Sequence, residues 1–185
     1  MDEYPNTLTT IAARAAEMCF SLHFPVVAFF CPWASEYRAS SRPDREKRCL
    51  LDLVCSIIRH MVDLLPVEFE TERDIGPDTF TKFLQGNDIL SNWGVAVELL
   101  TSLSALIRVP FFVILDGLEH LEGTAVQAYF ASLLRVIMSF ATMGVGDGKF
   151  VKILLTTSGN SKTVTRTADG LPRGCLEFMD LNEGC

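Results

Sequence analysis

Residues 111–122 carry a cluster of side chains that could take part in metal or acid–base chemistry. This segment reads Phe-Phe-Val-Ile-Leu-Asp-Gly-Leu-Glu-His-Leu-Glu, so five apolar residues lead directly to Asp116. A continuous apolar run is typical of a strand that is buried on both faces of a sheet. Ligands of open α/β sheets collect at the carboxyl ends of such strands. The position of Asp116 is therefore that of a carboxylate able to hold a magnesium ion, with His120 as a candidate general base nearby.

Each of these residues also has a simpler interpretation. Asp116 could cap the next helix or fix a turn together with Gly117, and His120 could be a solvated or hydrogen-bonded loop residue. The hydroxyls of residues 156–158, at the end of a later apolar run, could contact a phosphate or simply satisfy backbone groups. A hydrolase built on Asp116, His120 and Ser158 is a further alternative, although the sequence has no Gly-x-Ser-x-Gly motif.

A phosphate-binding glycine loop is not present in the 185 residues. The motif Gly-x-x-x-x-Gly-Lys-Ser/Thr does not occur. Residues 144–148 contain alternating glycines, but this segment follows a predicted helix and precedes a predicted strand, which is the reverse of a dinucleotide-binding turn. We interpret it as a turn that ends the helix.

The elements that must position these residues alternate between helix and strand. Helical spacing of apolar residues predicts helices at residues 7–20, 50–65, 80–84, 93–107 and 124–143. Short runs rich in β-branched and aromatic residues predict strands at residues 26–31, 111–116 and 151–156, with a weaker one at 175–179. Residues 34–45 and 68–78 are expected to form irregular loops. The alternation predicts an α/β fold with a mainly parallel sheet flanked by helices and joined by right-handed crossovers.

Composition limits the possible classes of protein. The length of 185 residues and the hydrophobic content of 49 % predict a single domain over residues 1–185. The net charge of −7 argues against nucleic acid as a partner, because binding to nucleic acid requires basic surface. The acidic N-terminal segment is unlike a secretory signal, and the most apolar stretch is too short to cross a membrane. The six cysteines include no Cys-x-x-Cys pair, so we expect reduced thiols and a cytoplasmic location.

Four segments give the chain a resemblance to a known family. They are the strand at 26–31 with the following Trp33, the long helix at 50–65, the helix and strand at 93–123, and the strand at 152–158. In this order they resemble the NACHT-type P-loop nucleotidases of the STAND class, particularly those of large fungal signalling proteins. The segment at 111–122 is similar to the Walker B strand of that family and is the most specific of the four. The resemblance implies a P-loop NTPase-like fold that lacks the first strand.

The resemblance also implies roles for individual residues. Asp116 matches the residue that holds magnesium, and Glu119 matches the acid that orients or deprotonates the attacking water. Thr9 matches the hydroxyl residue of the P-loop helix, while Leu8 takes the place of the P-loop lysine. Thr157 and Ser158 are expected near the nucleotide. Magnesium with ATP or GTP is the cofactor that this resemblance implies, and the missing glycine loop predicts weak nucleotide binding or none.

Several positions differ from the pattern of the family. Glu119 stands where the family usually has Asp, and His120 stands where it usually has another acid. Ser158 is followed by glycine instead of the arginine that lies near the phosphates in the family. These changes argue against efficient hydrolysis.

The missing first strand has a structural consequence as well. In the family it lies between the strands that match residues 151–156 and 175–179, so its loss would leave strand edges uncovered. We therefore expect a protein partner or self-association, with no nucleic acid and no membrane. The resulting functional hypothesis is a degenerate or truncated NACHT-like core that acts as an interaction or regulatory module in signalling. The alternative is a fragment of an active nucleotide-dependent STAND switch whose P-loop lies upstream.

Overall fold

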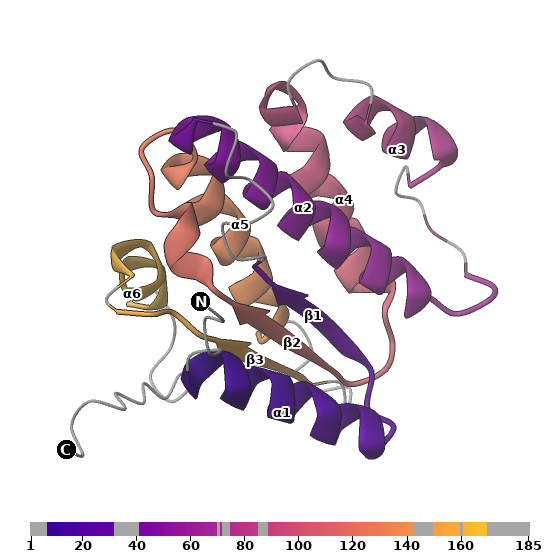
Figure 1. The fold of residues 1–185 in the computed structure, drawn as a ribbon. Coiled ribbons are helices and arrows are strands. Elements are labelled where there is room, and N and C mark those ends of the chain that lie inside the picture. The colour runs from indigo at the N-terminus through magenta and orange to yellow at the C-terminus, as the bar shows by residue number, and fades with distance from the viewer. Residues whose placement is uncertain are drawn as a thin grey trace.

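A three-stranded parallel sheet forms the centre of the part of the chain that the structure describes. The computed structural model describes residues 7–31, 41–69, 71, 75–84, 89–142, 150–159 and 161–169. Strands β1 (Val26–Phe30), β2 (Phe111–Asp116) and β3 (Val151–Leu155) lie in the order β1-β2-β3, with β2 in the middle (Figure 1). Both pairs of strands are parallel. The predicted α/β fold with a parallel sheet flanked by helices is confirmed.

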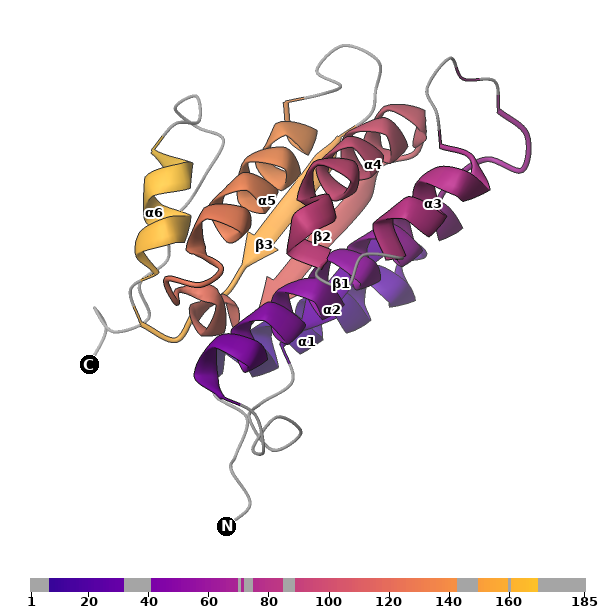
Figure 2. The same ribbon diagram turned by 90° about the horizontal axis from the view of Figure 1, so that it is seen from above.

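Three helices cover one face of this sheet. Helices α2 (Arg42–Asp63), α4 (Trp93–Leu106) and α5 (Gln127–Phe140) lie side by side over the strands (Figures 1 and 2). Their apolar stripes meet Val27, Val113 and Val151, which point to this face from the three strands. The buried aromatic rings Phe111, Phe130 and Phe140 also belong to this cluster. Truncating one such ring would cost about 3–5 kcal/mol, so this layer is the main source of stability.

Among the described elements, one helix covers the opposite face. Helix α1 (Thr7–Ser21) packs against β1 and β2 on the side away from α2, α4 and α5 (Figure 1). It faces the sheet with the short side chains of Ala12, Ala16 and Cys19. These pack against Val26 of β1 and Ile114 of β2. Because the contacting residues of α1 are small, the helix lies close to the strands but buries little apolar surface.

Shorter elements complete the described structure. Helix α3 (Pro77–Leu84) and the 3-10 helix η1 (Ile89–Asn92) pack beside α4, and η2 (Leu118–Leu121) follows β2 directly. Helix α6 (Lys162–Ala168) follows β3 and packs against α5 (Figure 2). Helices η1, η2 and α6 were not predicted from the sequence.

Some predicted boundaries were wrong. Helix α2 begins at Arg42, within the segment expected to be a loop, because Ser41 accepts a hydrogen bond from the backbone N–H of Asp44 and a proline lies in the first turn. Helix α3 begins at Pro77 rather than at residue 80. Helix α5 begins three residues later than predicted, because the N–H groups of Val126 and Gln127 both donate to the carbonyl of Gly123 and form a turn.

Two predictions fall outside the described residues: the strand at 175–179 and the glycine turn at 144–148. Within the described ranges, no helix combines the length and apolar character needed to cross a membrane.

Candidate functional site

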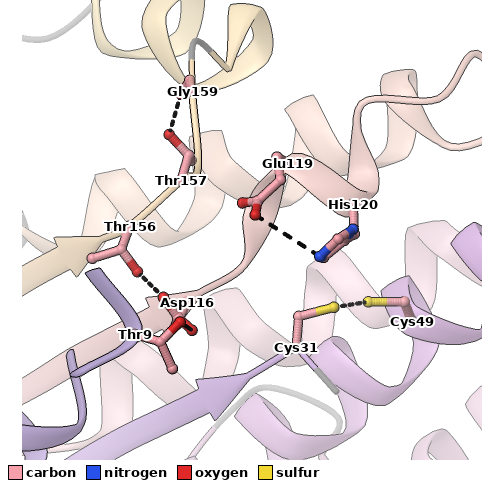
Figure 3. A network of polar contacts seen from close by, with 9 residues as sticks. All are labelled: Thr9, Cys31, Cys49, Asp116, Glu119, His120, Thr156, Thr157 and Gly159. Carbon is pink, nitrogen blue, oxygen red and sulfur yellow. Dashed lines mark hydrogen bonds and ion pairs between the residues drawn. The ribbon is translucent and has the colours of Figure 1, made fainter. Parts of the chain in front are cut away.

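The carboxylate of Asp116 is the centre of a polar cluster at the carboxyl end of the sheet. Its Oδ2 atom accepts a hydrogen bond of 2.8 Å from the hydroxyl of Thr9, and its Oδ1 atom accepts one from the hydroxyl of Thr156 (Figure 3). Thr9 lies in the first turn of α1, and Thr156 follows the last residue of β3. The side chain is nearly inaccessible, since Asp116 is only 5 % exposed. The two hydroxyl donors satisfy a buried charge that would otherwise be costly.

Backbone hydrogen bonds fix the position of this carboxylate. The N–H of Cys31, just after β1, donates to the carbonyl of Asp116 at 3.0 Å, and the N–H of Thr156 donates to the carbonyl of Leu115 at 2.9 Å. The next residue, Gly117, has a φ of 77°, and a Cβ atom at this position would lie 2.8 Å from the Cβ of Cys31. Glycine is therefore required both by the backbone conformation and by the close approach of Cys31. This turn directs the chain into η2.

Glu119 and His120 lie on η2, close to this cluster (Figure 3). The Nε2 atom of His120 lies 3.8 Å from Oε1 of Glu119, with side chains that are 32 % and 20 % exposed respectively. The Oε2 atom of Glu119 is buried and accepts no hydrogen bond from the described residues. A buried carboxylate oxygen without a donor is unusual in a folded protein.

The described residues offer oxygen atoms of the kind that magnesium takes as ligands, but they do not form a triphosphate site. Magnesium prefers oxygen ligands and is usually held by one or two carboxylates together with water and phosphate oxygens. The oxygens of Thr9, Asp116 and Glu119 are of this kind; within the described ranges, no group of three or more His, Cys, Asp or Glu side chains forms a complete metal site. A triphosphate also needs a cation and a row of backbone N–H groups. The apolar residue Leu8 precedes Thr9, and the sequence has no P-loop motif.

The other predicted nucleotide-binding residues do not join Asp116. The hydroxyl of Thr157 donates to the carbonyl of Gly159 at 2.9 Å and so stabilises a local turn (Figure 3). Ser158 is exposed in the same turn. Among residues 156–158, the hydroxyl that donates to Asp116 is that of Thr156, which was considered above only together with those of its two neighbours.

Polar contacts of two further glutamates were not predicted from the sequence. Glu122 accepts hydrogen bonds from the hydroxyls of Ser161 and Thr163 and from the backbone N–H of Thr163, and so caps the start of α6. Glu46 is 7 % exposed and bonds to Arg42, with its carboxylate packed against Gly123. Arg42 and Glu46 have the i,i+4 spacing of ion pairs on a helix, so the sequence could have indicated their contact. The contacts of Glu122 with Ser161 and Thr163 join distant parts of the chain, so no spacing in the sequence indicates them.

The thiols of Cys31 and Cys49 also lie beside this cluster (Figure 3). Their Sγ atoms are 2.8 Å apart, and both residues are free cysteines. Contact with Cys49 is the main cause of a raised pKa at the Cys31 thiol; burial adds to it, followed by the negative charges of Cys49, Glu119 and Asp116.

Comparisons of the chain with protein-family models, curated proteins and solved structures found no match.

Proposed function

We propose that this chain is a degenerate NACHT-like nucleotidase core that acts as an interaction or regulatory module in signalling rather than as an enzyme. The observation that carries this proposal is the hydrogen bond from Thr9 to Asp116. It joins the start of α1 to the end of β2, which is the relation expected between the hydroxyl residue of a P-loop helix and a Walker B aspartate. The two residues that would share a magnesium ion are thus brought together.

The surroundings of this pair argue against catalysis. Both oxygens of Asp116 are already engaged by hydroxyl groups of the protein, and the side chain is buried. Phosphoryl transfer depends on neutralising the charge of the phosphates, but Leu8 stands where the lysine would be and glycine follows Ser158. The oxygen ligands have therefore been kept as a structural contact, without the groups that would bind and activate a nucleotide.

The interaction role is supported by the edge of the sheet. Within the described residues β3 pairs only with β2, so its other edge has no strand partner there. Ile153, Leu154 and Leu155 are only partly buried on this edge strand, although they point alternately to both faces. An extended protein segment with apolar residues on both of its faces would complete these contacts and the backbone ladder. We propose a protein partner of this kind, in the cytoplasm, where cysteines stay reduced.

Calorimetric titration with magnesium and ATP or GTP, run beside sedimentation analysis, tests this function. We expect no binding heat at nucleotide concentrations up to the millimolar range, and concentration-dependent association with itself or with an added partner. Magnesium-dependent nucleotide turnover that disappears in Asp116→Ala would overturn the assignment. A chain that stays monomeric and is not recovered with any partner would contradict the interaction role.

The same hydrogen bond also favours an alternative, which is an active nucleotide-dependent switch. If a longer chain placed a glycine-rich phosphate-binding segment directly before α1, the side chains of Thr9 and Asp116 would already be in position to share a magnesium ion. The codons upstream of the first methionine distinguish the two. An in-frame P-loop motif supports the switch, whereas a stop codon leaves the degenerate core.

A further inference from the structure

Cys31 and Cys49 come from different elements and place their sulfur atoms in direct contact. Cys31 follows β1, and Cys49 lies in the second turn of α2 (Figure 3). Their Sγ atoms are 2.8 Å apart, whereas a disulfide bond is about 2.03–2.05 Å long. The side chains already point toward each other, so a small movement would bring the sulfur atoms to bonding distance. Cys19 and Cys55, the other described cysteines, are also free.

We propose that Cys31 and Cys49 form a reversible disulfide site, oxidised by hydrogen peroxide and reduced by a small thiol. Peroxide first transfers an oxygen atom to one sulfur, which gives a sulfenic acid and water. The second thiol then attacks this sulfur, the S–S bond forms, the S–O bond breaks, and the hydroxyl leaves as water with the remaining thiol proton. In total two thiols lose two electrons and two protons, and one peroxide becomes two water molecules.

The surroundings of the pair set its reactivity. Thiolates are the reactive form of cysteine, and the contact with Cys49, together with burial and the acids Glu119 and Asp116, raises the pKa of the Cys31 thiol. The Cys31 thiol is therefore slow to react at neutral pH and reacts faster at alkaline pH. Cys49 is only 4 % exposed, while Cys31 is partly exposed, so an oxidant reaches the pair from the side of Cys31.

Oxidation at this position would tether two elements that border the candidate site. Cys31 also donates its backbone N–H to the carbonyl of Asp116, so the covalent link would join α2 to the strand end beside that carboxylate. This inference does not depend on the proposed function, because it rests only on the contact between the two thiols.

Peptide mapping of the oxidised full chain tests the site. The protein is treated with hydrogen peroxide, its remaining thiols are alkylated, and it is digested without reductant for mass spectrometry. We expect the cross-linked peptide pair of Cys31 and Cys49 as the main product, lighter by two hydrogen atoms than the two peptides together. Dithiothreitol should restore both free peptides, and raising the pH from 7 to 9 should increase the rate by about tenfold or more.

Two variants serve as controls. Cys55→Ser changes another cysteine of α2 and should leave the cross-link intact, whereas Cys31→Ser should abolish it and leave Cys49 open to alkylation. Recovery of both cysteines as separately alkylated or sulfonic peptides in the wild-type chain would overturn the site. The same holds if either cysteine pairs mainly with another one. The wild-type measurement needs no substitution, so it remains decisive even if a variant folds poorly.

Discussion

Thr9 and Asp116 are 107 positions apart in the chain, yet the hydroxyl of Thr9 donates a hydrogen bond of 2.8 Å to Oδ2 of Asp116. This contact ties helix α1 to the middle strand of the sheet at its carboxyl end. Together with the bond from Thr156, it leaves the buried carboxylate with a donor on each oxygen. A polar contact of this kind holds two elements of the fold together, so its removal should be measurable as a loss of stability.

Replacing Thr9 by valine keeps the shape of the side chain but removes the donor to Asp116. A buried acceptor that loses its partner costs about 1–3 kcal/mol, so Thr9→Val should lower the free energy of unfolding by that amount in urea denaturation. The control is Thr165→Val, in which an exposed threonine loses only a bond to a backbone carbonyl of its own helix. Its effect should stay within about 0.5 kcal/mol. Equal losses of unfolding free energy in the two variants would show that the Thr9–Asp116 hydrogen bond stabilises the fold no more than a local bond within a helix.

Replacing Gly117 by alanine should be strongly destabilising. The backbone φ of 77° is unfavourable for alanine by about 1–2 kcal/mol, and the new Cβ would lie 2.8 Å from the Cβ of Cys31. Gly159→Ala is the matched control, because Gly159 also has a positive φ, of 87°, but open space around the new atom. The difference between their urea midpoints measures the destabilisation caused by the steric clash with Cys31.

Gly94→Ala, within α4 and also in open space, should instead stabilise the protein by about 0.5–1 kcal/mol.

Stability should fall at alkaline pH because of the buried thiols. Contact with Cys49 and burial raise the pKa of Cys31 in the folded protein above the value of about 8.5 in the unfolded chain. The folded state then holds a proton that the unfolded state releases, so this contribution is complete below about pH 8.5 and is lost as the pH rises. The slope is at most about 1.4 kcal/mol per pH unit for this group. In urea denaturation at pH 7 to 10, the free energy of unfolding of Cys31→Ser should fall less steeply with pH than that of the wild type. Identical slopes would show that the Cys31 thiol does not cause the loss of stability.

The oxidised chain should unfold at a higher temperature than the reduced chain. A disulfide between Cys31 and Cys49 would close a loop between positions 18 apart, which stabilises by about 3 kcal/mol through the unfolded state. For a chain of this size the expected increase in Tm is about 6–12 °C. Differential scanning calorimetry with and without dithiothreitol measures it. Cys31→Ser should show no such difference, and a similar shift in that variant would assign the effect to other cysteines.

The fold could be predicted from the sequence because its main signals are local. The run at residues 111–116 reads as a buried strand by itself, and the structure places it as the central strand β2. The predicted starts of helices were wrong where a cap or a turn determines the first residue of the helix. Ser41 starts α2 earlier than the apolar stripe shows, and the carbonyl of Gly123 delays α5. Helix α6 is short and depends on Glu122, which lies 41 positions before Thr163, so no local pattern announces it.

The candidate site was predictable only in part, for a similar reason. Asp116 follows from the strand that carries it, but its two donors come from α1 and from the end of β3, and only the register of the sheet determines that Thr156 rather than Thr157 reaches it. The thiol pair depends on how α2 packs on β1, which the spacing of the cysteines does not encode.

The weak attachment of α1 has a consequence for the motions of the folded protein. Its sheet-facing residues Ala12, Ala16 and Cys19 are small, whereas the larger cluster lies on the other face and does not involve this helix. Amide hydrogens of α1 should therefore exchange with deuterium sooner than those of β2, by local opening rather than by global unfolding. Each such opening withdraws the Thr9 donor and uncovers the Asp116 carboxylate, so the acid becomes transiently available to solvent while the rest of the molecule stays folded.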